Sequence, residues 1–233
     1  MNKEQELENY LSISPKKFGI YLFEPKSSKN LYKEEFIFNE NSNFLNLKEL
    51  KLFLDKHIFK IEKLGGKFIK NIHLIYEDNK ILNLEIGIKK KNYNTYFTKK
   101  YLENSLIEAK DIFRQNYANY EIMHMIINKF LVNGKRYLSF GENLKCDDIA
   151  LEIQFISISN NIVYDLNKIL NGYQIKIIKY LDGSYVKNNF KDYREISEMS
   201  HKILRGYNKN EVSFVPKNTK KLAFFEKFFQ LFS

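Results

Sequence analysis

The side chains that could bind a metal or carry out catalysis are scattered along this sequence. The four histidines, at positions 57, 73, 124 and 201, are far apart, and none belongs to a His-Glu-x-x-His pattern, in which one helix face presents two imidazoles to zinc. Cys146 stands alone, which excludes an internal disulfide and a cysteine-cluster zinc site. We therefore expect no metal site, a structural role for His124 and a buried position for Cys146.

Motifs for nucleophilic catalysis and phosphate binding are also missing. The sequence contains no Gly-x-Ser-x-Gly elbow, no Walker loop and no Gly-x-Gly-x-x-Gly. The acidic pairs Glu34-Glu35 and Asp147-Asp148 are typical of solvated turns and strand ends, whereas acid–base catalysis needs two carboxyl groups in contrasting environments. These observations predict a protein that is not an enzyme and that binds no cofactor.

The most regular pattern is a predicted amphipathic helix over Leu222–Ser233. At about 100° per residue, its apolar half is rich in phenylalanine, and two lysines precede it. The stretch is shorter than the roughly 20 apolar residues that span a bilayer, so it predicts a helix lying in the membrane interface. The predicted membrane-binding residues are Lys220, Lys221, Leu222, Phe224, Phe225, Phe228, Phe229, Leu231 and Phe232.

Charge is concentrated beside this apolar face. Between Lys202 and Ser233, seven Lys or Arg residues face two Glu, so this part carries +5 of the net charge of +10. Each lysine near an anionic leaflet adds about 1 kcal/mol to the free energy of membrane binding, whereas phenylalanine side chains are only partly buried in an interface. These contributions indicate an anchor that binds reversibly. It follows a predicted linker at Gly206–Thr219. The alternative is that the last helix packs on the core of the protein, as amphipathic helices of globular domains do.

Composition limits the class of protein. The 233 residues suffice for one large or two small domains, with 44% hydrophobic and 28% charged residues and no apolar run near 18 residues. The polar, acidic start lacks the apolar segment of a signal peptide, so we expect a cytoplasmic protein. The pI of about 9.3 would ordinarily indicate a nucleic-acid partner. The sequence is also rich in Asn, Ile, Phe and Tyr, which is typical of codon bias toward A and T, so the basic charge alone does not indicate such a partner.

One basic segment supports a different function. Lys89–Lys100 interleaves lysines with aromatic residues, as surfaces for single-stranded nucleic acid do. A solvated strand end and loop in a lysine-rich protein is the commoner origin of such a segment, and no nucleic-acid fold signature accompanies it, so nucleic acid is kept as the alternative partner.

Apolar periodicity places the elements of the first half. Residues 17–23 and 31–38 predict two strands of a hairpin, and apolar residues three and four apart from Leu47 predict a helix that Gly65-Gly66 ends. A second hairpin is predicted from strands over 68–76 and 82–88, and Lys89-Lys90-Lys91 ends its second strand.

The second half is predicted as a helix, three strands, a second helix and a last strand. Thr98 caps a helix that ends near Asn116, and a strand over 122–132 turns at Asn133-Gly134 into a strand over 136–140. A strand over 149–158, a helix over 162–170 that Asn160 or Asn161 can cap, and a strand over 174–180 follow. The fold class is α+β.

The order of these segments resembles the FtsA family, actin-like ATPases that tether bacterial division filaments to the cytoplasmic membrane. The resemblance lies in a helix (Leu106–Phe113), a strand with an Ile-x-His core (Ile122–Gly134), a long Leu-Glu strand (Leu151–Ser157) and a helix followed by a strand (Ile162–Tyr180). Phe224–Phe229 resembles the family's membrane-targeting helix.

The resemblance implies a partial actin-like, ribonuclease H-like first half, a small FtsA-type insert subdomain and a terminal amphipathic helix. The predicted ranges are 1–94 for the actin-like part, 95–181 for the FtsA-type subdomain, 182–217 for a return segment and linker, and 218–233 for the helix. In the family, the extra subdomain carries protomer contacts and meets other division proteins. The resemblance therefore implies self-association and division partners on the cytoplasmic side of the membrane.

Two departures from the family bear on activity. The family's first phosphate loop, between its first two strands, contains Gly and Asp, whereas the turn taken as its equivalent, Phe23–Lys29, has neither. Nothing in the sequence resembles the second actin-like domain that closes over the nucleotide. The expected function is a non-catalytic, membrane-associated adaptor of cell division; an ATPase completed by a partner chain is a third possibility.

Overall fold

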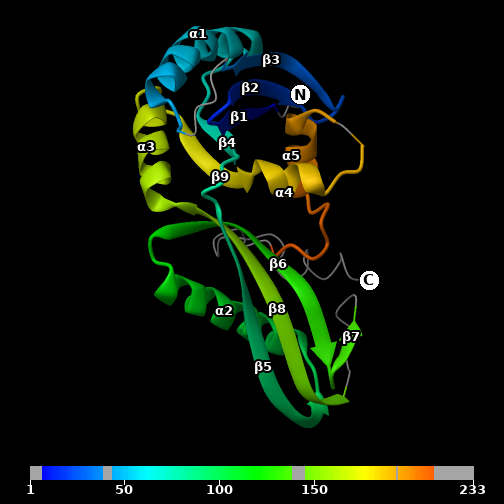
Figure 1. Ribbon diagram of the computed structural model, residues 1–233. Coiled ribbons are helices and arrows are strands. Elements are labelled where there is room, and N and C mark those ends of the chain that lie inside the picture. Colours follow the sequence, from blue (N-terminus) through cyan, green and yellow to red (C-terminus); the bar gives the residue numbers. More distant parts are fainter. Residues whose placement is uncertain (1–6, 39–43, 138–144, 193, 213–233) are drawn as a thin grey trace. The chain divides into compact units, whose positions relative to one another are not determined.

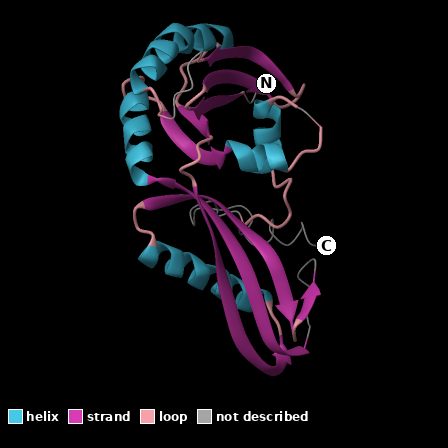
Figure 2. Cartoon of the chain, in the orientation of Figure 1, coloured by secondary structure: helices cyan, strands magenta, loops and turns pink. Residues whose placement is uncertain are grey.

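A computed structural model describes residues 7–38, 44–137, 145–192 and 194–212 of the chain. They form two compact units that alternate along the sequence. Among the described residues, the first unit comprises those of 7–81 and 161–207, and the second comprises those of 82–160 and 208–212. Each unit has its own β-sheet and its own helices (Figure 1; Figure 2), so the predicted α+β class is confirmed.

The first unit contains a mixed five-stranded sheet in the order β3-β2-β1-β4-β9. Its strands are β1 (Glu8–Ser14), β2 (Lys17–Glu24), β3 (Lys29–Ile37), β4 (Asn71–Tyr76) and β9 (Lys176–Asp182). The predicted hairpin of β2 and β3 is confirmed, and β1 pairs antiparallel with β2. On the other side, β1, β4 and β9 run parallel, so their carboxyl ends meet at one edge.

Helix α1 (Leu47–Gly65) follows β3 and agrees with its prediction. Asn46 caps it by accepting a hydrogen bond from the Glu49 backbone N–H at 3.2 Å, and Gly66, at φ +68°, ends it in the left-handed region. Its buried side chains share one helical face: Leu50, Phe53, Leu54, Ile58 and Ile61. Phe53 packs against Phe18 of β2, with ring centroids 6.0 Å apart, so α1 covers the face of the sheet to which Phe18 points.

The opposite face carries an apolar cluster of its own. Side chains alternate between the faces of a strand, so Tyr21 and Phe23 of β2 point away from α1. They pack with Ile75 of β4 and Leu181 of β9 against two short helices, α4 (Gly183–Asn188) and α5 (Ile196–Leu204). Helix α3 (Asn160–Asn171) precedes β9.

The second unit is an antiparallel sheet covered by one helix, in the order β5-β8-β6-β7. Its elements are β5 (Leu82–Tyr96), α2 (Lys99–Asn116), β6 (Tyr120–Val132), β7 (Lys135–Tyr137) and β8 (Lys145–Ser159). Thr98 caps α2 as predicted. The turn at Asn133-Gly134 is also confirmed, and both residues have positive φ, as a two-residue hairpin turn requires. Phe113 of α2 stacks on Phe155 of β8 at 4.9 Å in the core.

The predicted second hairpin is wrong. The strand at 68–76 does not pair with the one that follows it; β4 lies between β1 and β9, whereas β5 pairs with β8 in the other sheet. The burial of β4 gives the reason, because Leu74, Ile75 and Tyr76 are all buried and a strand covered on both faces needs neighbours on both edges.

Three elements went unpredicted because their patterns are weak. Strand β1 lies in the stretch interpreted as a polar start, since its apolar residues are interrupted by Asn9, Ser12 and Ser14. Helices α4 and α5 lie in the predicted return segment, and with six and nine residues they are too short for a clear period. The predicted linker at 206–219 begins with ordered contacts, because Tyr207 stacks on Phe190 at 4.4 Å.

The two units also divide the chain differently from the predicted ranges. Strand β5, which lies in the predicted range 1–94 except for its last two residues, belongs to the second unit. Strand β9 and the part of α3 after Asn160, which lie in the range 95–181 except for Asp182, belong to the first. The second unit is therefore an insertion between β4 and α3, to which the residues after Tyr207 return.

Candidate functional site

The carboxyl ends of β1, β4 and β9 border a pocket of about 1000 Å³. Ser14 ends β1, Tyr76 ends β4 and Asp182 ends β9. In α/β proteins, ligands bind outside the carboxyl ends of parallel strands, which makes this carboxyl-edge pocket the candidate ligand site of the first unit. The turn between the first two strands, β1 and β2, is therefore Ser14–Lys17. The prediction that Phe23–Lys29 is the turn equivalent to the family's first phosphate loop was wrong, because that turn joins the second strand to the third.

The turn at this pocket satisfies its own backbone donors. Ser14 Oγ accepts hydrogen bonds from the backbone N–H of Lys16 at 3.3 Å and of Lys17 at 3.0 Å. Phosphate loops work by directing unpaired backbone N–H groups at the anion. Here the serine hydroxyl takes the place that a phosphate oxygen would have, and the turn contains neither Gly nor Asp.

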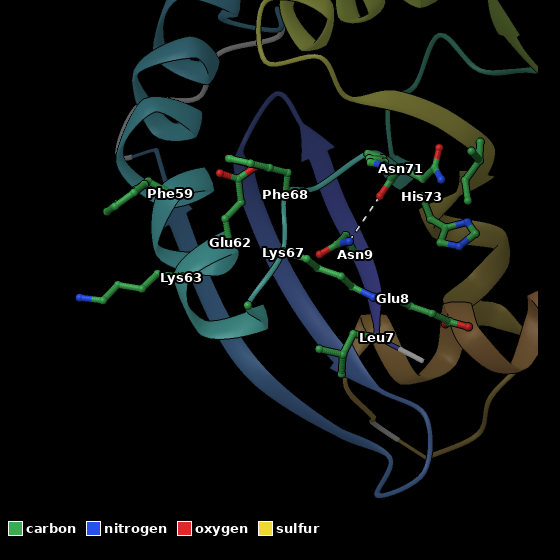
Figure 3. Close-up of a pocket in the computed structure, with 13 residues that line it drawn as sticks. Leu7, Glu8, Asn9, Phe59, Glu62, Lys63, Lys67, Phe68, Asn71 and His73 are labelled. Atoms are coloured by element: carbon green, nitrogen blue, oxygen red, sulfur yellow. Dashed lines mark hydrogen bonds between the residues drawn. The ribbon is translucent and has the colours of Figure 1, made fainter. Parts of the chain in front are cut away.

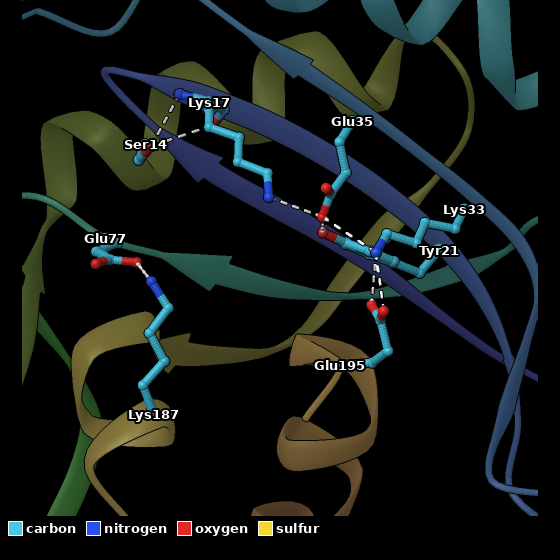
Figure 4. A network of polar contacts seen from close by, with 8 residues as sticks. All are labelled: Ser14, Lys17, Tyr21, Lys33, Glu35, Glu77, Lys187 and Glu195. Atoms are coloured by element: carbon cyan, nitrogen blue, oxygen red, sulfur yellow. Dashed lines mark hydrogen bonds and ion pairs between the residues drawn. The ribbon is translucent and has the colours of Figure 1, made fainter. Parts of the chain in front are cut away.

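Ion pairs hold several of the basic groups on and beside the pocket wall (Figure 4). Lys17 Nζ lies 2.8 Å from Glu35 Oε1, which also accepts a hydrogen bond from the Tyr21 hydroxyl at 2.6 Å. Burial alone would raise the pKa of Glu35, but the hydrogen bonds from Lys17 and Tyr21 outweigh it and hold that pKa below its usual range. The interpretation of Glu35 as a solvated acid was therefore wrong.

Two further pairs connect the helices to this edge of the sheet. Lys33 on β3 contacts both carboxylate oxygens of Glu195 at 2.8 and 2.9 Å, and Lys187 of α4 contacts Glu77 Oε2 at 2.5 Å. A polyphosphate entering the pocket would have to displace these carboxylates from their lysines, which costs electrostatic energy before any is gained.

Asp182, at the end of β9, serves as a helix cap. Its carboxylate accepts hydrogen bonds from the backbone N–H groups of Ser184 at 3.2 Å and Tyr185 at 3.1 Å, and the residue is buried. Across the described ranges of the chain, no three His, Cys, Asp or Glu side chains are placed to hold a metal ion together.

A second cavity, of about 1090 Å³, lies at the amino ends of β1 and β4 (Figure 3). It is lined by residues that include Asn9, Lys63, Phe68 and His73. Asn9 Oδ1 and His73 Nδ1 are buried and have no hydrogen-bond partner among the described residues. Burial lowers the pKa of His73, which stacks on Tyr10 with ring centroids 5.1 Å apart.

In the second unit, the segment after Tyr207 adds to the edge of the sheet. Ile127 N–H donates to Asn210 O at 2.9 Å and Val212 N–H donates to Met125 O at 2.8 Å, so this segment pairs with β6. Val212 is buried in the core of the unit. His124 Nδ1 lies 2.7 Å from Glu211 Oε1, and both side chains are largely shielded from solvent. The predicted structural role of His124 is confirmed, and so is the buried position of Cys146.

The predicted membrane-binding residues, Lys220, Lys221, Leu222, Phe224, Phe225, Phe228, Phe229, Leu231 and Phe232, lie outside the described residues. The predicted interface helix therefore stays a prediction. Among the helices that the structure describes, none is both long and apolar enough to cross a membrane.

The basic segment Lys89–Lys100 runs from β5 into α2. Lys90 forms an ion pair with Glu108, and Lys89 lies 3.5 Å from Asp148. Tyr93 and Tyr96 are 81% and 56% exposed, and the Lys145 ammonium group lies over the Tyr96 ring, 5.4 Å from its centroid.

No protein-family model matches this sequence, and no curated protein matches it. Several solved structures are similar in fold. One is the cytoplasmic domain of EpsL, an inner membrane component of the type II secretion system of Vibrio cholerae, with 8% identity, a TM-score of 0.36, and 78% of this chain and 57% of that one covered. Another is the PilM-PilN type IV pilus biogenesis complex, with 7% identity, a TM-score of 0.43, and coverage of 78% and 49%.

A third is a Bacteroides thetaiotaomicron protein of unknown function described as having an actin-like ATPase fold, with 10% identity, a TM-score of 0.34, and coverage of 80% and 56%. This chain spans about half the length of these solved structures. Likeness at this level concerns the path of the chain and says nothing about what this protein binds.

Proposed function

We propose that this protein is a non-catalytic adaptor that attaches peripherally to the cytoplasmic face of the membrane. It resembles FtsA without the second actin-like domain, and it self-associates or binds cell-division partners. The tail at Leu222–Ser233 provides the membrane contact. One short amphipathic helix binds lipid weakly, so self-association or a tethered partner adds a second contact and raises the effective concentration at the surface.

The carboxyl-edge pocket supports the non-catalytic part of this proposal, because contacts within the protein already occupy several of the groups that could bind phosphate. The Ser14 hydroxyl occupies two N–H groups of the turn, and the Lys17–Glu35 and Lys187–Glu77 pairs hold the nearby charges. These contacts hold the turn between β1 and β2, join β2 to β3, and join α4 to the residue after β4. They support a structural role for an edge that binds phosphate in the actin-like ATPases that the sequence resembles.

The second candidate is a basic module that binds single-stranded nucleic acid. It is favoured by the exposed rings of Tyr93 and Tyr96, onto which bases can stack, next to the lysines of the same segment. The ion pairs of Lys89 and Lys90 oppose it, because a phosphate backbone would compete with Asp148 and Glu108.

Cosedimentation with anionic vesicles distinguishes the two candidates. We expect the full chain to sediment with vesicles, and removal of Leu222–Ser233 to abolish this, because the tail supplies the apolar contact. The same deletion leaves oligonucleotide binding unchanged if the second candidate is correct. Vesicle binding that is undiminished by the deletion would refute the membrane tail, and tight oligonucleotide binding that Tyr93→Ala and Tyr96→Ala weaken together would favour the module.

Nucleotide binding tests the non-catalytic assignment. We expect titration calorimetry with ATP and Mg²⁺ to give no heat of binding, because two N–H groups of the turn and the ammonium groups of Lys17 and Lys187 already have partners. The companion variant Ser14→Gly and Glu35→Gln frees these groups and serves as the comparison. Tight binding by the unaltered chain would instead support an ATPase completed by a partner chain.

A further inference from the structure

The solvent-facing side of α1 exposes large apolar side chains. Leu52 is 53% exposed and Phe59 is 72% exposed, and Phe68, just beyond the helix, is 80% exposed. Leu52 and Phe59 are seven residues apart, so at about 100° per residue they lie within about 20° of each other on the helix. Single exposed apolar residues are common, whereas two in line with a third nearby form a stripe.

Lysines flank this stripe. Lys56 and Lys63 lie on the same side of α1 as Phe59, because they are three and four residues from it. Figure 3 shows Phe59 and Lys63 extending from the outer side of the helix, away from the sheet. Across residues 47–70, seven lysines face three acidic residues, a net charge of +4.

The acidic side chains near the stripe have partners of their own. Asp55 accepts a hydrogen bond from the Tyr173 hydroxyl at 2.5 Å, and Glu62 accepts one from the Ile69 backbone N–H at 3.1 Å. No ion pair within the described ranges involves Lys56 or Lys63, so both ammonium groups are available to an outside anion.

We propose that the stripe formed by Leu52, Lys56, Phe59, Lys63 and Phe68 is a second contact with an anionic membrane surface. Phenylalanine rings that enter the headgroup layer and lysines that remain at its surface are the combination by which amphipathic segments bind such membranes. The inference rests on the proposed function, since a peripheral protein with one weak anchor needs a second contact.

The absence of tryptophan from the sequence provides a direct test. Phe59→Trp places a single indole on the stripe, at a position exposed enough to accept the larger ring. With vesicles of phosphatidylcholine and phosphatidylglycerol, its emission should shift to the blue and be quenched by brominated lipid. Tyr164→Trp is the matched control, because Tyr164 is 67% exposed on α3 of the same unit, and its emission should stay unchanged.

Affinity measurements complete the test. Phe59→Ser with Phe68→Ser should weaken vesicle binding about tenfold, since partial burial of two rings is lost, and each lysine changed to glutamine should cost about fivefold. Circular dichroism should be unaltered, because these side chains project into solvent.

The outcomes separate this inference from the proposed function. If the full chain sediments with vesicles but the indole at position 59 shows neither a blue shift nor quenching, the stripe is not a lipid contact and the proposed function stands. If the control indole responds equally, the inference also fails, since the contact is then not specific to α1. If no variant and not even the full chain binds vesicles, the proposed function itself is refuted.

Discussion

Replacing Phe228 and Phe229 by aspartate should lower the affinity of the full chain for anionic vesicles at least a hundredfold. Two rings lose their partial burial, which is worth about 1 kcal/mol or more each, and two new negative charges cost about 1 kcal/mol each near an anionic leaflet. The sum of about 4 kcal/mol corresponds to almost a thousandfold, and a hundredfold allows for non-additivity. Cosedimentation at increasing lipid concentration measures it.

The matched control adds the same two charges to the polar half of the predicted helix, as Gln230→Asp and Ser233→Asp. It should lose only the electrostatic part, about thirtyfold, so the difference between the two double variants isolates the contribution of the phenylalanines. In cells, a fluorescent fusion of the phenylalanine variant should be diffuse and the unaltered fusion should be at the rim. Equal losses in both variants would mean that the tail binds by charge alone.

Replacing Glu211 by alanine should destabilise the second unit by about 3 kcal/mol. The carboxylate lies 2.7 Å from His124 Nδ1, the side chain of His124 is fully shielded, and that of Glu211 is 10% exposed. Removing one partner of such a buried pair leaves the other poorly solvated, which costs more than the pair contributes. Urea unfolding followed by the near-ultraviolet signal of the tyrosines measures the change.

Glu121→Ala is the control for this variant, because Glu121 is an exposed carboxylate on β6, the strand that carries His124. It should change stability by less than about 0.5 kcal/mol. Amide hydrogen exchange locates the effect, since the Val212 N–H that donates to Met125 should lose protection in Glu211→Ala alone. An unchanged urea midpoint for Glu211→Ala would show that the pair does not stabilise the unit.

The sequence was sufficient for elements whose signals are local. Helix α1 has a cap at Asn46 and a stop at Gly66, α2 has a cap at Thr98, and the Asn133-Gly134 turn needs two residues of positive φ. Each signal lies within a few residues of the element that it defines, so no tertiary information was needed.

The arrangement of the strands could not be predicted in the same way. The parallel pairing of β1 with β4 joins residues more than 60 positions apart, and the pairing of β4 with β9 joins residues more than 100 apart. No local pattern encodes such pairs, and the alternative of a hairpin between neighbouring strands was the simpler prediction. In addition, the polar residues of β1 interrupt its apolar pattern, so the strand that pairs with β4 was not predicted.

The candidate site could not be predicted either, because its residues are also far apart in the sequence. Ser14, Glu77 and Lys187 come from distant parts of the chain, and they meet only because three parallel strands end at one edge. A serine whose hydroxyl accepts hydrogen bonds from the backbone N–H groups two and three residues later forms a recognisable turn motif. The sequence Ser14-Pro-Lys-Lys17 could therefore have predicted this turn. The pairing of Glu211 with His124 spans 87 positions and had no local signal.

The pairing of Asn210 and Val212 with β6 determines where the chain can be shortened. A protein truncated at Gly206, the start of the predicted linker, would lose this edge as well as the tail, and the unpaired backbone groups of Met125 and Ile127 would become a template for aggregation. Its failure to reach lipid would then have two causes. Stopping after residue 212 preserves these backbone pairs, so a stop codon there removes the tail and the residues that precede it without opening the edge of the sheet.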